Sequence, residues 1–124
     1  MEFDTNFVHL LIKDKILVVT YKSGLHITRE IAQKIVTDRL SFTEGKELAA
    51  MIISHGVISM DKPAREYLAS EEGTKGLTAT AIIVDSSFSR SLGNFFLIVN
   101  KTKMPVKIFS NIPMAIKWLQ KYIV

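Results

Sequence analysis

The stretch LAAMIIS, residues 48–54, decides the fold because six of its seven residues are apolar. A strand with one face in water alternates apolar and polar residues, whereas a strand buried on both faces is apolar almost throughout. TATAIIV, residues 78–84, has a similar composition. Two such strands predict the buried centre of a parallel sheet that helices cover.

Outward from these strands, the apolar period switches repeatedly between strand and helix. Residues 6–12 and 16–21 predict a hairpin, so the first strand is antiparallel and the sheet is mixed. The predicted order is β-β-α-β-α-β-α-β-α, an α/β fold with a mixed, mostly parallel five-stranded sheet. The other predicted elements are a strand over 106–110 and helices over 28–42, within 60–73, over 86–100 and over 111–123.

Length and composition indicate one domain spanning residues 1–124. The chain is 48% hydrophobic and 23% charged, which suits a buried core with a solvated surface. It has no cysteine, which excludes disulfides, thiolate zinc sites and cysteine nucleophiles. No apolar run approaches the roughly 18 residues of a membrane span. The first ten residues lack the pattern of a signal peptide, so we expect a cytoplasmic protein with no transmembrane segment.

Charge is unevenly distributed along the chain, whose formal net charge is +4. Residues 86–124 contain six basic residues and no acidic one. Such a region would suit an acidic partner, an anionic lipid surface or a phosphate, although scattered lysines are usually a solvated surface. The basic residues form no block and are not interleaved with aromatic residues, so we expect no nucleic-acid partner.

The stretch VISMDKPAREYLAS, residues 57–70, contains the first candidate binding residues. Asp61 is typical of a helix N-cap, and Pro63 suits the first helical turn. Ser59 lies two residues before this cap and Lys62 follows it. We predict that Ser59, Asp61 and Lys62 contribute to a partner or ligand surface. The simpler interpretation is a well-capped helix start.

The second candidate group is DSSFSR, residues 85–90, which follows a predicted buried strand. Ligands of open α/β sheets gather at the carboxyl ends of strands. Hydroxyl groups and an arginine at a helix start would suit a phosphate or a carboxylate. The alternative is that an acidic or hydroxyl side chain caps the helix and the arginine is solvated. The candidate residues are Asp85, Ser86, Ser87 and Arg90.

Catalytic and metal-binding patterns are not found in the sequence. His9, His26 and His55 lack the spacing of metal ligands. There is no glycine-rich phosphate loop and no nucleophile elbow. We therefore expect a non-enzymatic protein without a cofactor or metal.

The predicted helix over 86–100 contains the run FFLIV, residues 95–99, which makes it apolar on more than one side. This is typical of a central, doubly covered helix. It is equally typical of a helix that meets a protein partner, a second copy of the chain or a lipid-like ligand.

Three stretches resemble the STAS family of anti-sigma-factor antagonists, the SpoIIAA-like domains. They are ISMDKPAREYL (58–68), AIIVDSSFSRSLGNFFLIVNK (81–101) and PVKIFSNIPMAIKWL (105–119). The resemblance implies a β-α superhelix over essentially the whole chain. It also implies a switch, in which phosphorylation of a serine just after the Asp adds charge and ejects a partner. Here Asp61 matches the Asp, but Lys62 follows it, so this hydroxyl is missing.

The resemblance implies a non-enzymatic protein-interaction module, in a regulatory role, that lacks the usual phosphorylatable serine. Its partner would be another protein or a second copy of the chain. The alternative function, which SEC14-type relatives of the family suggest, is a carrier for a small anionic or lipid ligand.

Overall fold

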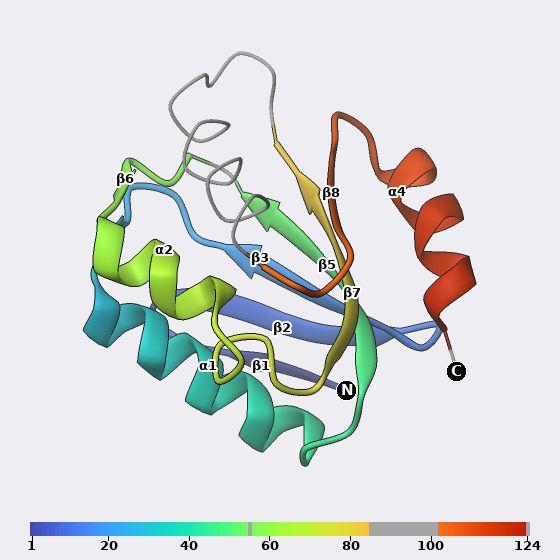
Figure 1. Cartoon of the computed structure of the whole chain (residues 1–124), viewed down its shortest axis with the longest axis horizontal. Helices are drawn as coiled ribbons and strands as arrows, with labels where there is room; N and C mark the ends of the chain where they lie inside the picture. Colours follow the sequence, from blue (N-terminus) through green and yellow to red (C-terminus); the bar gives the residue numbers. More distant parts are fainter. Residues whose placement is uncertain (55, 85–101, 124) are drawn as a thin grey trace.

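A mixed six-stranded sheet forms the centre of the computed structural model, which describes residues 1–54, 56–84 and 102–123 (Figure 1). The strand order is β1-β2-β3-β5-β7-β8. β2 is antiparallel to both β1 and β3, and the pairs from β3 to β8 are parallel. The strands are β1 (Glu2–Asp4), β2 (Val8–Lys13), β3 (Ile16–Tyr21), β5 (Leu48–Ser54), β7 (Leu77–Ile83) and β8 (Val106–Phe109).

The predicted SpoIIAA-like α/β fold with a mostly parallel sheet is confirmed, but the count of five strands was wrong. The sixth strand, β1, is exposed at all three residues and has no apolar alternation to indicate it. Sequence reading also missed a separate two-stranded parallel sheet of β4 (His26–Ile27) and β6 (Ser59–Met60). The predicted helix over 86–100 lies outside the described residues.

The β2–β3 hairpin turns on Asp14 and Lys15, which have positive φ angles of 52° and 67°. Two central residues with positive φ are the geometry of a tight hairpin whose twist matches that of its strands. The turn fixes the register Lys13↔Ile16 and, from there, Leu11↔Val18.

Helices lie on both faces of the sheet (Figure 1). α1 (Arg29–Thr43) and α2 (Lys62–Ala69) cover one face, and α4 (Ile112–Leu119) packs on the other, where it continues into a 3-10 turn, η1 (Gln120–Tyr122). Under α4 the sheet presents small buried side chains, among them Ala79 and Ala81. These let Ala115 and Leu119 of the helix pack closely against the strands.

Hydrogen bonds at their first turns explain where the helices begin. Thr28 caps α1 by accepting from the Ile31 N–H at 3.3 Å. Asn111 caps α4 in the same way, accepting from the Met114 N–H at 2.9 Å. An N-cap of this kind satisfies an N–H that has no partner within the helix.

α2 ends at Ala69, earlier than its apolar pattern suggested, because the Ser70 side chain interrupts it. Its hydroxyl donates to the Tyr67 carbonyl at 2.5 Å and accepts from the Gly73 N–H at 3.1 Å. The chain therefore folds back on the helix, and a Cβ atom at Gly73 would lie 2.0 Å from the Tyr67 carbonyl oxygen.

The substitution Gly73→Ala should therefore destabilise the protein. The backbone has to shift to admit the methyl group, and overpacking of this kind costs about 1–3 kcal/mol. Chemical denaturation measures the loss. Lys75→Ala, an exposed position in the same connection, should change stability by less than about 0.5 kcal/mol. Equal stability of the two variants would contradict the close packing at Gly73.

Candidate functional site

The parallel strands β3, β5 and β7 end at one edge of the sheet. Tyr21 at the end of β3 pairs with Ser54 at the end of β5, and Ile53 pairs with Ile83 at the end of β7. The chain leaves β3 and β5 at this edge to form the β4–β6 pair (Figure 1). This carboxyl edge is where ligands and partners of open α/β sheets usually gather.

Asp61 caps α2 at this edge, as predicted. Its Oδ1 accepts from the Ala64 N–H at 2.9 Å, and its carbonyl accepts from the Arg65 N–H at 3.0 Å. Lys62 is the first helical residue and Pro63, which has no N–H, is the second. The capping carboxylate and the proline thus leave little of the helix start free for an added phosphate.

Ser59 lies in β6, beside His26 of β4. His26 Nδ1 and the Ser59 hydroxyl share a hydrogen bond of 2.7 Å, which ties the two short strands together through their side chains. Ser59 is half-buried and His26 is exposed. The structure therefore brings Ser59, Asp61 and Lys62 together on one rim.

An aliphatic side chain is exposed on the same rim. Ile58 has 39% of its surface accessible, although isoleucine is usually a core residue. The Lys62 ammonium lies 3.8 Å from the Glu66 carboxylate, an exposed pair that contributes little to stability. We call the surface formed by His26, Ile58, Ser59, Asp61 and Lys62 the α2 rim.

The second candidate group lies outside the described residues. β7 ends with Ile83 at the same edge as the α2 rim. The binding role predicted for Asp85, Ser86, Ser87 and Arg90 stays a prediction. The same holds for the apolar run 95–99.

Arg39 is a buried charge that sequence reading missed. It is only 5% exposed and lies on the inner face of α1. Its guanidinium donates to the carbonyls of Lys75 at 2.7 Å and Gly73 at 3.0 Å, so it fastens the α2–β7 connection to α1. Burial lowers the pKa of the Arg39 guanidinium from its ordinary value. The helical spacing from Ile35 would have placed Arg39 on the buried face.

A small apolar cavity of about 60 Å³ lies beside Arg39 on the face that α1 and α2 cover. Tyr21 lines it and is buried, and burial raises the pKa of Tyr21 to about 12 although the positive charge of Arg39 opposes the rise. The remaining walls are mostly apolar. They include Val19, Val36, Ile52, Leu68, Ile82, Met104 and Val106.

The described part of the chain contains no group of three His, Asp or Glu residues placed to hold a metal ion. Within the same residues, no helix is long and apolar enough to cross a membrane.

The six-stranded mixed sheet with helices on both faces is a SpoIIAA-like fold. A similar solved structure is that of an uncharacterised protein of the DUF3478 family with a SpoIIAA-like fold from Shewanella loihica PV-4. The two share 17% sequence identity and a TM-score of 0.58, over 94% of this chain and 98% of that chain. At this identity the likeness shows the fold alone.

The chain belongs to the family described as Domain of unknown function (DUF7793), which it matches over residues 10–123. In the comparison with curated proteins, nothing matched.

Asp61→Ala should destabilise the protein by about 1 kcal/mol, because the Ala64 N–H loses its acceptor. Asp61→Ser should retain most of the stability, since a serine oxygen accepts the same hydrogen bond. Thermal unfolding monitored by circular dichroism compares the two. A serine variant as unstable as the alanine variant would mean that Asp61 is not an ordinary cap.

Tyr21 should ionise only near pH 12 in the folded protein. Because its folded-state pKa is raised, the stability that it contributes is complete below about pH 10 and is lost as pH rises towards 12. Ultraviolet absorbance of tyrosinate measures this ionisation, and Tyr21→Phe should lack the last step of the curve. A Tyr21 step near pH 10 while the protein remains folded would contradict its burial.

Proposed function

We propose that this protein is a non-enzymatic STAS-like interaction module whose α2 rim binds another protein without a phosphoserine switch at position 62. The observation that carries the proposal is the exposed Ile58 beside the capped start of α2. The resemblance to the SpoIIAA-like family points to the same helix start as the partner surface.

The composition of the α2 rim supports a protein partner. An exposed aliphatic side chain with charged neighbours is the usual arrangement of an interface, with an apolar centre and a polar rim. Ile58 supplies the apolar centre, and Lys62 supplies an exposed cation, which lies 3.8 Å from the Glu66 carboxylate. The partner is therefore a protein segment that offers an apolar side chain to Ile58 and a carboxylate to Lys62.

Within the described residues, the size of the apolar cavity beside Arg39 does not favour the lipid carrier. At about 60 Å³ it is smaller than the roughly 150 Å³ apolar cavity that takes up benzene, so an acyl chain does not fit. Arg39, the cation at its wall, already donates to two backbone carbonyls. A structural role for Arg39 accounts for these contacts without an anionic ligand.

A photo-crosslinking amino acid at position 58, introduced in the cells that make the protein, identifies the partner. The purified partner is then titrated calorimetrically with the wild-type protein and with Ile58→Glu. The variant should bind at least tenfold more weakly, which corresponds to about 1.4 kcal/mol. Binding should weaken because the glutamate introduced at position 58 brings an unpaired negative charge close to the carboxylate of the partner.

Ile112→Glu is the matched control, because Ile112 is 40% exposed and lies on α4, across the sheet from α2. It should leave the affinity for the partner unchanged. Equal binding by the wild-type protein and Ile58→Glu would contradict the assignment of the interaction to the α2 rim.

A further inference from the structure

Among the described residues, one face of the sheet is covered only in part. α4 packs on this face over β7, with β5 and β8 beside it (Figure 1). Over β1, β2 and β3 the described residues place no helix on the same face. Leu11 of β2 and Val18 of β3 lie there, next to Ile53 of β5, and all three are only half-buried. The face therefore has a ridge, α4, beside a stretch of sheet that no described helix covers; we call this stretch, whose side chains are largely apolar, the recess.

The strand register shows how charge is distributed across this face. Residues that pair directly across neighbouring strands point to the same side of a sheet. Two rows of side chains cross the sheet on this face, each from the β1 edge to the β8 edge. The first row consists of Glu2, Leu11, Val18, Met51, Ala81 and Lys107. The second row runs Asp4, His9, Thr20, Ile53, Ile83, Phe109.

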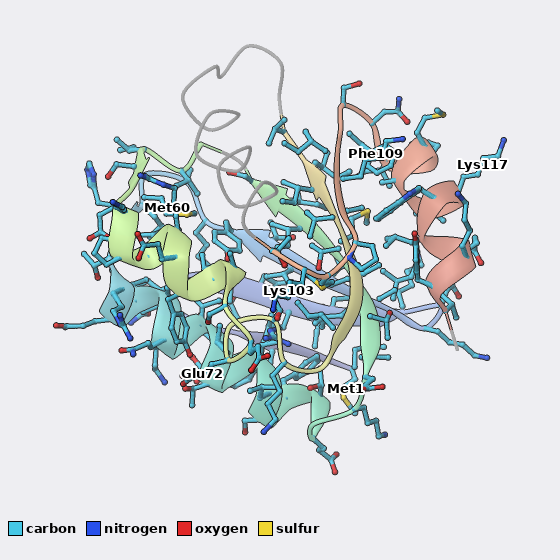
Figure 2. The ribbon with its side chains drawn as sticks, in the orientation of Figure 1. Met1, Met60, Glu72, Lys103, Phe109 and Lys117 are labelled. Carbon is cyan, nitrogen blue, oxygen red and sulfur yellow. The ribbon has the colours of Figure 1, made fainter. Side chains whose placement is uncertain are left out.

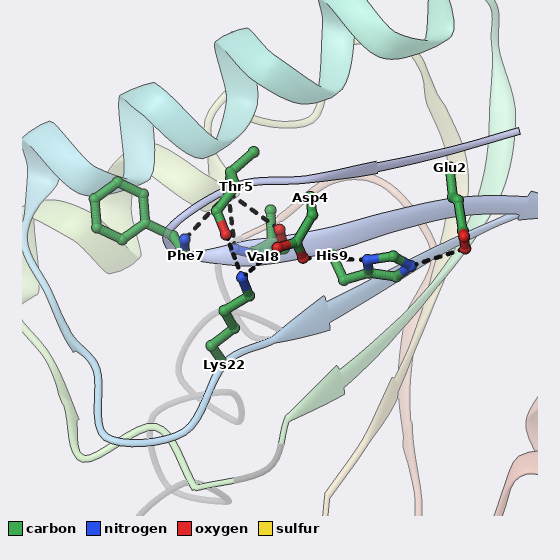
Figure 3. Close-up of polar contacts among 7 residues, drawn as sticks. All are labelled: Glu2, Asp4, Thr5, Phe7, Val8, His9 and Lys22. Carbon is green, nitrogen blue, oxygen red and sulfur yellow. Dashed lines mark hydrogen bonds and ion pairs between the residues drawn. The ribbon is translucent and has the colours of Figure 1, made fainter.

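The β1 edge of the recess is acidic. Glu2 Oε2 and Asp4 Oδ1 each lie 3.2 Å from a ring nitrogen of His9, and Lys22 lies 2.8 Å from Asp4 (Figure 3). The hydrogen bond from Lys22, and then that from His9, hold the pKa of Asp4 below its usual value. Both carboxylates are exposed and reach solvent beside the apolar floor.

The opposite side of the face is basic. Lys107 ends the first row at the β8 edge. Phe109, which ends the second row, packs against Trp118 of α4 with ring centroids 5.7 Å apart. Lys117 lies on the outer side of α4, pointing away from the sheet (Figure 2), and Lys121 follows in η1. Residues 102–123 contain no acidic side chain that would neutralise these lysines.

We propose that this half-covered face binds the same face of a second copy of the chain around a two-fold axis. A two-fold axis places the same patch on both subunits, so the patch must complement itself. Rotation about an axis that lies in the interface, parallel to the strands and midway between the two edges, brings the lysines of one copy over the carboxylates of the other. It also lays each α4 ridge over the recess of its partner, where the aliphatic stems of Lys117 and Lys121 cover the apolar floor and their ammonium groups reach towards the carboxylates.

The flank of α4 that borders the recess supplies the contact nearest to the axis. Helical spacing puts Ile112 and Ile116 on one side of α4, whereas Trp118 and Tyr122 lie on the side that packs against Phe109. Ile112 is 40% exposed and Ile116 is half-buried. In the dimer these two side chains meet their copies, which removes apolar surface from water.

This interface is separate from the α2 rim and does not rest on the function proposed for that rim. Ile58 and Ile112 have nearly equal exposure, 39% and 40%, and lie on elements that pack on opposite faces of the sheet. The pair of substitutions Ile58→Glu and Ile112→Glu therefore changes one surface at a time.

Sedimentation equilibrium over a series of protein concentrations tests the proposal. The wild-type protein should dimerise, and Ile112→Glu should raise the dissociation constant at least tenfold. An acidic residue in the first turn of a helix is favourable, so this variant is expected to fold. Ile58→Glu should dimerise like the wild-type protein. A wild-type protein that stays monomeric throughout, or an Ile112→Glu variant with unchanged affinity, overturns the proposal.

Reversal of charge tests the two-fold arrangement itself. The first variant carries Glu2→Lys, and the second carries Lys117→Glu and Lys121→Glu. Each should dimerise less well alone, because like charges then meet across the interface, and the two mixed in equal amounts should regain the affinity. Lys46→Glu with Lys75→Glu, at exposed positions near α1 and α2, is the control and should not affect dimerisation. Mixing without recovery rejects the two-fold pairing of these edges.

Discussion

The parallel pairing of β5 with β7, buried on both faces, is the constraint on which the rest of the structure depends. Small side chains make it possible: Ala50 lies in the core under α1 and α2, and Ala79 and Ala81 lie under α4. Larger residues would move the covering helices away from the sheet. The shared direction of these strands brings their carboxyl ends to one edge, and this edge positions β6 and the start of α2. The α2 rim thus follows from one buried strand pair.

Much of this arrangement could be predicted from the sequence because strong local signals agree with the packing. The strands over 16–21 and 48–54 were predicted at their observed bounds, and Asp61 caps α2 as expected. β1 could not be predicted, since its three residues are all exposed and become a strand only by pairing with β2. The β4–β6 pair is only two residues long in each strand, too short for any periodicity. The end of α2 depends on a serine hydroxyl that folds the chain back, which an apolar pattern does not contain.

The candidate site was predictable only in part, for a similar reason. Ser59, Asp61 and Lys62 are adjacent in sequence, so locating the helix start was enough to bring them together. His26 comes from a segment that is distant in sequence, and only the pairing of β4 with β6 brings it within hydrogen-bonding distance of Ser59. Arg39 was readable from helical spacing, but its carbonyl partners at Gly73 and Lys75 depend on the turn after α2. The half-covered face was invisible in the sequence, because its rows combine residues from six strands that only the sheet order aligns.

Native mass spectrometry of the protein purified gently from its own cells tests the central claim most directly. An interaction module should retain a second protein, which the Ile58→Glu variant should lose, and residues 59–62 should carry no phosphate. A small molecule that is retained on the native protein and released on denaturation would contradict the account. It would mean that the protein is a carrier.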